Sequence, residues 1–300
     1  MSQSPRIKFF CRSFNLELYR LSRRLYEGAG YPCVRLTDQT ADGYFFTMLD
    51  DQDCDIAINV DEDCFLTDID HVLALAFRAD AEGWVNIGCS DAGVGCPRIG
   101  NPVVTNPFFN IFNLRQLRTQ WRGKATQSEV RHLSYAQQKE QILSSFDADK
   151  AYLRTDFMTS AYERSATEPY YNFFFWMQLA FPGRTLYLPS HRNSDGFTTE
   201  LLTSDGRVFA RHTWFARFFH PSWLTRLFEH STNNNHSARI DAIIDSSYAM
   251  RGMERPRFGF SDSCAFALNG IARWSIKIPQ RIANWPHKLM KKTHSNPLPN

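Results

Sequence analysis

CDIAINVDEDCFL, residues 54–66, is the stretch that decides the predicted fold of this chain of 300 residues. Apolar side chains dominate residues 56–60 within it. A run of this kind is typical of a strand that is buried on both faces of a parallel sheet. Three consecutive acids, Asp61, Glu62 and Asp63, follow the run directly. The stretch therefore predicts a central strand with carboxylates at its C-terminal end.

Strands and helices are expected to alternate on both sides of this central strand. Apolar spacing predicts helices at 16–26, at 41–51 and from Asp68 onward, and strands at 7–14, 31–38 and 84–91. This order predicts an α/β fold with a mostly parallel central sheet and right-handed crossovers.

The later part of the chain continues the alternation and then changes character. We expect a loop at 92–106, a strand at 106–114, helices within 120–150 and 150–185, a helix at 194–202 and a strand at 207–219. The stretch STNNNHS at 231–237 is typical of a linker, and a helical tail follows it. The predicted domains are therefore residues 1–230 and a helical, basic C-terminal extension at 231–300.

The acids that end the predicted strands are the first candidates for a functional site. Ligands of open α/β sheets lie outside the carboxyl ends of the strands. Asp38, Asp91 and the acids at 61–63 are all expected at that edge. Carboxylates two residues apart, such as Asp61 and Asp63, can both reach a hard cation such as Mg²⁺ or Mn²⁺. The alternative is a solvated acidic turn or the N-terminus of a helix.

Composition restricts the function classes. The content of 43% hydrophobic and 22% charged residues excludes a disordered or fibrous chain. The net charge of +3 does not favour nucleic acid as a partner. Seven cysteines without a CxxC or zinc-like spacing favour reduced thiols in a cytoplasmic compartment. Neither a signal peptide nor a membrane-spanning run is expected.

Several common motifs are absent from the sequence. It has no GxxxxGK[ST], no GxGxxG that opens the first helix and no GxSxG. Their absence disfavours an ATPase, a dinucleotide-dependent dehydrogenase and an α/β-hydrolase.

The order of elements and the acidic turn resemble the GT-A glycosyltransferases, the nucleotide-diphospho-sugar transferase superfamily of the DxD type. The resemblance covers roughly residues 7–220, and its anchors are DED at 61–63, SDAGVGCPRIGNPVVTNPFFNIFN at 90–113 and SDGFTTELLTSDGRVFARHTWFARFF at 194–219. It implies a GT-A-like (Rossmann-like) sheet flanked by helices. It also implies transfer of a sugar from a nucleotide-sugar donor to a glycan or lipid-linked saccharide acceptor, with Mn²⁺ or Mg²⁺ as cofactor.

The resemblance also implies roles for single residues. In this family the DxD acids hold the metal that bridges the donor diphosphate, and a later strand often supplies a histidine ligand. Asp63 would then bind the metal, and Asp61 would contact the metal or the donor ribose. His212 would be the further metal ligand, although a histidine among aromatic residues is more often a packed residue. Glu62 and Asp38 would belong to the donor site, with Asp38 at the nucleoside.

The remaining candidates concern the donor and the catalytic base. Cys11 and Arg12, at the end of the first strand, are expected to contact the nucleoside. Arg98 lies in a glycine-rich loop, where it contacts phosphate or is simply solvated. An inverting transfer needs a base for the acceptor hydroxyl, for which Asp195 and Glu200 are the candidates. The alternative role of Asp195 is to cap the predicted helix, and a retaining transfer requires no such base.

The C-terminal segment is basic and apolar. No acid follows Asp262, whereas six cations do: Arg273, Lys277, Arg281, Lys288, Lys291 and Lys292. Tryptophan and isoleucine residues are interleaved with them. Such a segment either lies on an anionic membrane surface or is a solvated tail. The expected localisation is cytoplasmic, with peripheral contact at the inner face of a membrane left open.

Two other functions remain open from the sequence. One is a sugar nucleotidyltransferase, although no glycine precedes Gly28 where such enzymes carry a glycine-rich signature. The other is a non-catalytic carbohydrate-binding module on a degenerate transferase fold, which the aromatic content of 14% favours. Release of pyrophosphate would indicate the first, and metal-independent binding of glycans the second.

Overall fold

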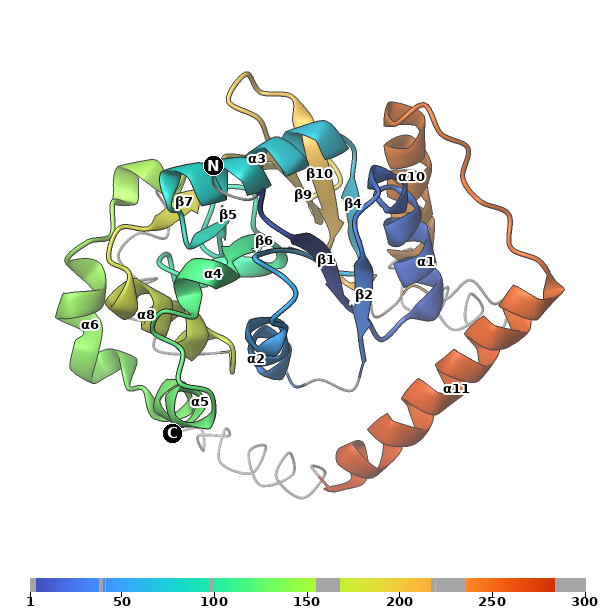
Figure 1. The fold of residues 1–300 in the computed structure, drawn as a ribbon. Coiled ribbons are helices and arrows are strands. Elements are labelled where there is room, and N and C mark those ends of the chain that lie inside the picture. The colour runs from blue at the N-terminus through green and yellow to red at the C-terminus, as the bar shows by residue number, and fades with distance from the viewer. Residues whose placement is uncertain are drawn as a thin grey trace, which may run out of the picture.

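A six-stranded sheet forms the centre of the protein (Figure 1). The computed structural model describes residues 4–37, 40, 42–97, 100–154, 168–216, 219 and 236–283. The strands lie in the order β2 (Cys33–Leu36), β1 (Ile7–Arg12), β3 (Ile56–Val60), β6 (Thr105–Asn113), β5 (Asn86–Ser90) and β7 (Thr185–Tyr187). Only β6 runs against the others, because its pairings with β3 and β5 are antiparallel and the remaining pairings are parallel. The predicted α/β class with a mostly parallel sheet is confirmed, and the arrangement is consistent with a Rossmann-like fold.

Strand β3 occupies the middle of this sheet, as its sequence predicts. All five of its residues are buried, and Ile58 pairs with Phe9 of β1 on one side and with Ile111 of β6 on the other. The single polar residue of the strand, Asn59, donates a hydrogen bond to the carbonyl of Pro107. Its buried amide nitrogen is thereby satisfied inside an otherwise apolar layer.

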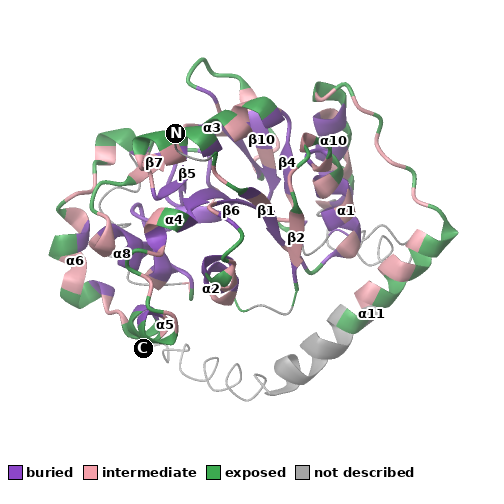
Figure 2. Ribbon diagram, in the orientation of Figure 1, coloured by how far each residue is buried: buried purple, intermediate pink, exposed green. Residues whose placement is uncertain are grey.

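Helices cover both faces of the sheet and bury its alternating side chains (Figures 1 and 2). One face packs against α3 (Ile69–Glu82). The other packs against α2 (Gly43–Asp50), α4 (Leu114–Leu117), α5 (Lys124–His132), α6 (Tyr135–Leu143) and α8 (Tyr171–Ala180). Short 3₁₀ helices lie at Glu27–Ala29 and Ala148–Lys150.

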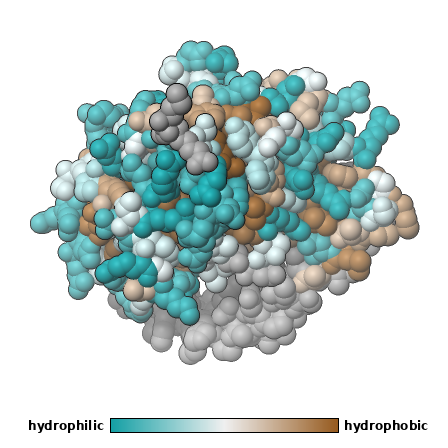
Figure 3. All heavy atoms as spheres, in the orientation of Figure 1, coloured by the Kyte–Doolittle hydropathy of each residue, from teal (hydrophilic) through white to brown (hydrophobic). Residues whose placement is uncertain are grey.

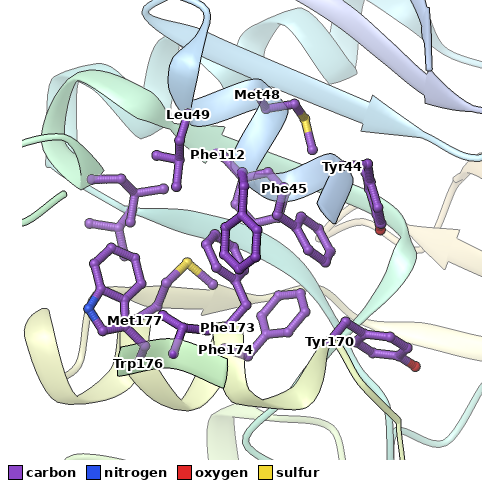
Figure 4. Close-up of a cluster of buried hydrophobic side chains, with 14 of the residues drawn as sticks. Tyr44, Phe45, Met48, Leu49, Phe112, Tyr170, Phe173, Phe174, Trp176 and Met177 are labelled. Carbon is purple, nitrogen blue, oxygen red and sulfur yellow. The ribbon is translucent and has the colours of Figure 1, made fainter. Parts of the chain in front are cut away.

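Aromatic rings fill the layer between β6, α2 and α8 (Figure 4). The ring of Phe45 stacks on Phe173 at 4.8 Å between centroids and meets Phe112 edge-on at 5.5 Å. Offset and edge-to-face pairs of this kind each add about 1 kcal/mol beyond the burial of their area. This layer fixes α2, which follows β2, against the centre of the sheet.

A smaller antiparallel sheet follows the acidic turn. It contains β4 (Cys64–Leu66), β10 (Val208–Thr213), β9 (Thr198–Leu202) and β8 (Ser190–Arg192) in that order. The stretch at 54–66 therefore contributes two strands, β3 and β4, to two different sheets. The predicted helix at 194–202 is wrong, because the β-branched pair Thr198 and Thr199 starts strand β9 and pairs with β10. Gly196, with φ of +73°, forms the turn between β8 and β9.

The helix starts follow local capping signals. Helix α3 starts next to Asp68, as predicted. Asp68 caps it by accepting the N–H of His71, and Gly83 with φ of +72° ends it. Asn15 caps α1 (Leu16–Arg24) by accepting the N–H groups of Glu17 and Leu18. The side chains at both caps occupy donors that a helix end leaves unpaired.

Two further helices complete the described chain. Helix α10 (His236–Met250) packs with α1 in a third apolar cluster that includes Leu21, Phe65 and Ile244. Helix α11 (Phe260–Ala283) follows along the edge of the molecule (Figure 1). Most of the predicted linker, residues 231–235, lies outside the described residues. Within the described part, no helix combines the length and apolarity that a membrane span requires.

Candidate functional site

The acidic turn Asp61–Asp63 joins the two sheets at the carboxyl ends of β1 and β3. The N–H of Asp61 donates to the carbonyl of Phe108 in the large sheet at 2.9 Å. The carbonyl of Asp63 accepts the N–H of Thr213 in the small sheet at 3.0 Å. The three side chains then diverge, and each has a different environment.

Asp63 lies beside His212. The Nε2 atom of His212 is 3.4 Å from Oδ1 of Asp63. His212 stands on β10 opposite Cys64, and its ring stacks on Phe108 at 4.2 Å with an angle of 2° between the planes. The ring is buried, and its Nδ1 has no hydrogen-bond partner in the described part of the chain. Two residues that the resemblance implies as metal ligands are thus adjacent.

The Asp61 carboxyl group is more deeply buried than the site beside Asp63. Its Oδ1 is buried and has no hydrogen-bond partner among the residues that the structure describes. Burial raises the pKa of Asp61 to about 8, with Arg12 opposing the rise and Asp63 and Glu62 adding to it. An unpartnered buried carboxylate oxygen is costly, so this atom is suited to a ligand group or a cation.

Arg12 and Tyr44 lie next to Asp61. The guanidinium of Arg12 is 5.1 Å from the centroid of the Tyr44 ring and 5.4 Å from that of Phe14. The Tyr44 hydroxyl is buried and has no partner within the described ranges, and burial raises its pKa well above the usual value. Cys11 is completely buried, and burial raises the pKa of its thiol as well. Of Cys11 and Arg12, both expected at the nucleoside, only Arg12 has an accessible polar group.

Glu62 makes a structural contact. Its Oε2 accepts the backbone N–H of Phe14 at 2.8 Å and that of Asn15 at 2.6 Å. The carboxylate therefore connects the acidic turn to the loop that follows β1. This connection holds the ends of β1 and β3 in register at the candidate site.

The two candidate bases lie in the small sheet and are already paired. Asp195 accepts the N–H groups of Phe197 and Thr198 at 2.8 Å, and Arg239 lies 3.3 Å from its other oxygen. These contacts, together with the Thr198 hydroxyl, hold the pKa of Asp195 below its usual value despite partial burial. Glu200 is buried with its carboxylate 2.8 Å from Arg211 Nε and 2.9 Å from His191 Nε2.

Asp91 directly follows β5 at the same edge of the sheet, as expected, but its side chain is fully buried. Its carboxylate accepts hydrogen bonds from the amide of Asn106 and from the hydroxyl of Tyr171 on α8. Gly100 packs directly against this carboxylate, and a Cβ atom there would collide with it. Asp91 therefore anchors the ends of the loop at 92–106.

An exposed aromatic cluster lies beside the Asp63–His212 pair. The Trp214 ring is 4.9 Å from that of His212, and its indole N–H donates to the hydroxyl of Thr199 at 2.8 Å. The backbone N–H of Trp214 donates to the carbonyl of Phe197. Phe197 and Phe215 are 40% and 36% exposed, with their rings 5.6 Å apart. His236 stacks on Phe215 at 5.2 Å.

Phe215 of this cluster has an unusual backbone. Its φ is +72°, a conformation that bulky residues rarely adopt. Strain of this kind occurs most often at binding and catalytic sites, where the surroundings enforce it. The sequence offered no signal for Trp214 and Phe215 beyond their aromatic character, which is more often a property of the core.

Two side chains of the site, those of Asp63 and His212, are placed to bind one divalent cation. The described residues contain no group of three or more His, Cys, Asp or Glu side chains arranged around a metal position. The Asp63 carboxylate nevertheless suits Mn²⁺ or Mg²⁺, and a neutral imidazole such as that of His212 is a common ligand of divalent metals. Such ions commonly take one or two protein ligands and complete their shell with water and phosphate oxygens, so the pair fits. Asp38 and Arg98 lie outside the described residues.

No family model matches the chain, and no curated protein matches it. The chain is similar to the crystal structure of a glycosyltransferase involved in the glycosylation of the major capsid of PBCV-1, with 12% identity and a TM-score of 0.27. The match covers 46% of this chain and 74% of the other chain.

Proposed function

We propose that the protein is a metal-dependent glycosyltransferase that uses a nucleotide-activated sugar. The observation that carries this proposal is the Asp63–His212 pair, 3.4 Å apart at the carboxyl end of β3. In an α/β sheet this edge is the usual place for a ligand. The GT-A resemblance of the sequence implies the same two residues as metal ligands.

Asp63 and His212 would hold Mn²⁺ or Mg²⁺ in this enzyme. A bound divalent ion would offset the negative charge of a leaving nucleoside diphosphate, which is a known role of metal ions in transfer reactions. The stack of His212 on Phe108 keeps the imidazole in one orientation, with Nε2 toward Asp63. Glu62 supports the same geometry through its contacts with Phe14 and Asn15.

The donor would lie over the ends of β1 and β3. Arg12 is half-buried there and would supply a fixed positive charge for phosphate, while Asp61 would supply an unpartnered carboxyl oxygen for a ribose hydroxyl. Tyr44 and Phe14 flank the guanidinium of Arg12 and limit its movement. Asp38 and Arg98 complete the donor site in this proposal.

The acceptor would bind on the cluster of Phe197, Phe215 and His236. Aromatic faces pack against the C–H face of a sugar ring, and a few polar groups fix its orientation. Arg239 lies under the ring of Phe197 at 5.5 Å and also contacts Asp195. A glycan or a lipid-linked saccharide fits this combination of exposed rings and charged groups.

Asp195 is the better placed base for an inverting transfer. It lies at the edge of the aromatic cluster through its contacts with Phe197 and Arg239. Glu200 instead has its carboxylate paired with Arg211 and His191 inside the small sheet. In this role Asp195 would accept the proton of the acceptor hydroxyl as that oxygen attacks the anomeric carbon.

A binding experiment tests the proposal directly. Thermal unfolding is followed with UDP-, GDP-, CMP- and dTDP-sugars, with Mn²⁺ or with EDTA. A ligand that binds only the folded state raises the midpoint, so one nucleotide is expected to stabilise the wild type only with metal. Asp63→Ala should abolish this shift, whereas Asp53→Ala should keep it, because Asp53 is 87% exposed before β3 begins.

Two outcomes would contradict the proposal. A well-folded Asp63→Ala variant that still transfers sugar would overturn the proposal. Glycan binding without metal and without any nucleotide shift would instead identify a carbohydrate-binding module, a function that the exposed rings of Phe197 and Phe215 also suit.

A further inference from the structure

Helix α11 is attached to the rest of the protein along one side. Asp262 forms an ion pair with Arg20 of α1, and Asn269 Oδ1 accepts the N–H of Leu16 at 3.0 Å. The guanidinium of Arg20 also lies 5.2 Å from the ring centroid of Phe266. Asp262, Phe266 and Asn269 are spaced at helical intervals, so they define the side of α11 that faces α1.

The other side of the same helix is exposed and apolar. Phe260 is 86% exposed and Leu268 is 67% exposed, the two highest values for large apolar side chains in the described chain. Cys264 and Ala267 are exposed as well, and the four positions share one helical face. Figure 3 shows apolar side chains gathered over this part of the molecule. Monomeric proteins rarely leave such a face uncovered without a partner.

The sequence extends the pattern along the rest of the helix. Isoleucine or tryptophan occurs at 271, 274, 278 and 282, which continues the spacing that Phe260, Cys264 and Ala267 begin. Cations occur at 273, 277 and 281, and no acid follows Asp262 in the chain. The charge of this segment is therefore complementary to an anionic surface.

We propose that α11 binds the surface of an anionic phospholipid bilayer, lying in the plane of the interface. Phe260 and Leu268 would enter the boundary between headgroups and acyl chains, and the cations at 273, 277 and 281 would contact lipid phosphates. A helix of 24 residues is about 36 Å long, so it offers several such contacts at once. This inference does not depend on the proposed function, since it uses no residue of the proposed metal, donor or acceptor sites.

Vesicle flotation tests the proposal with the full-length chain. The probes are vesicles of pure phosphatidylcholine and vesicles with about one third phosphatidylglycerol. The wild type is expected to float with the anionic vesicles only, and to release as salt is raised. Phe260→Glu with Leu268→Glu should reduce the bound fraction at least tenfold. Lys277→Ala with Arg281→Ala should weaken binding about 25-fold, or roughly fivefold for each cation.

A matched pair of substitutions provides the control. Phe77→Glu with Met250→Glu places two acids on other helices, at side chains that are 43% and 48% exposed. This control should bind vesicles as the wild type does, and circular dichroism should show that all variants are folded. The proposal is overturned if the wild type ignores anionic vesicles or binds both kinds equally. It is also overturned if light scattering shows a dimer that Phe260→Glu with Leu268→Glu dissociates, because a second copy would then cover the face.

Discussion

The Glu62 carboxylate accepts the backbone N–H of Asn15 at 2.6 Å, and this contact connects the acidic turn after β3 to the start of α1. The same oxygen accepts the N–H of Phe14. A residue in the middle of an acidic tripeptide thus has a structural partner 47 positions away. The relationship leads to a first prediction.

Replacing Glu62 should lower the free energy of unfolding and should have little effect on how tightly the folded protein binds the nucleotide. Glu62→Ala removes an ionised acceptor from two N–H groups and is expected to cost about 2 kcal/mol in the free energy of unfolding. Glu62→Gln keeps an oxygen acceptor and should lose less. Urea unfolding measures both values. A variant with unchanged stability and lost nucleotide binding would assign Glu62 to the donor instead.

His212 and Asp63 should act as one unit toward a metal ion. Each single change to alanine is expected to weaken Mn²⁺ binding in the presence of nucleotide at least tenfold, and the double change should add little, because residues that share one ligand are not additive. Isothermal titration with Mn²⁺ measures the affinities. Independent, fully additive losses would mean that the two side chains serve different sites.

The ring of Phe215 should contribute to binding of the acceptor and not to binding of the nucleotide-sugar donor. Phe215→Ala is expected to raise the KM for the acceptor several-fold and to leave the nucleotide-dependent thermal shift unchanged, because the ring packs with Phe197 and His236 of the exposed aromatic cluster.

Phe215→Gly separates the ring from the backbone strain at this position. Glycine adopts a φ of +72° without strain, so this variant should be at least as stable as Phe215→Ala and equally deficient in acceptor binding. Wild-type acceptor kinetics in both variants would remove Phe215 from the proposed site.

Asp195 offers a test of the catalytic base. Asp195→Asn should reduce the transfer rate by at least 100-fold and remove the acidic limb of the pH–rate profile, if the carboxylate accepts the proton of the acceptor. The contacts with Phe197 and Thr198 are retained in part by an amide oxygen, so the fold should survive. A rate that stays near the wild type, with an unchanged profile, would leave Asp195 only its role in the turn.

The Arg6–Asp55 pair should make stability depend on acid pH. Hydrogen bonds from Arg6 hold the pKa of Asp55 at about 2, against partial burial. Because the pKa is lower in the folded state, the contribution is present above the unfolded value near 4 and is lost as pH falls toward 2.

Asp55→Asn should therefore cost about 1 kcal/mol at neutral pH, allowing for screening by solvent, and progressively less in acid. Asp53→Asn is the matched control, since that side chain is 87% exposed and 3.7 Å from Arg6. Unfolding curves between neutral pH and pH 2 measure the difference. An equal loss at every pH would show that the carboxylate of Asp55 acts without its charge.

The sequence was sufficient for the central strand and for the position of the acids at 61–63 directly after it, because both depend on local patterns. An apolar run predicted β3, and Asp68 with the spacing after it predicted the start of α3. The same local view failed at Thr198 and Thr199. Their place in a strand depends on pairing with β10, which lies later in the chain.

The contacts of the site were less predictable than its location. Glu62 contacts Asn15, and His212 stacks on Phe108. Both pairs are far apart in the sequence, so no local sequence pattern predicts them. His212 itself was identified through the family resemblance and not from its surroundings. Tyr44 and Trp214 gave no signal at all, since an aromatic residue in a sequence most often indicates core.

Asp61 and Asp63 are two residues apart, yet each is anchored to a different sheet. Asp61 is fixed by Phe108 of the large sheet, and Asp63 by Thr213 of the small one. The separation between the two carboxylates is therefore a property of how the sheets dock. Repacking the buried Phe209 or Leu201 of the small sheet would shift Asp63 and His212 together, relative to Asp61. Substitutions far from the acids can thus retune the site, which makes the interface between the sheets the natural target for altering its specificity.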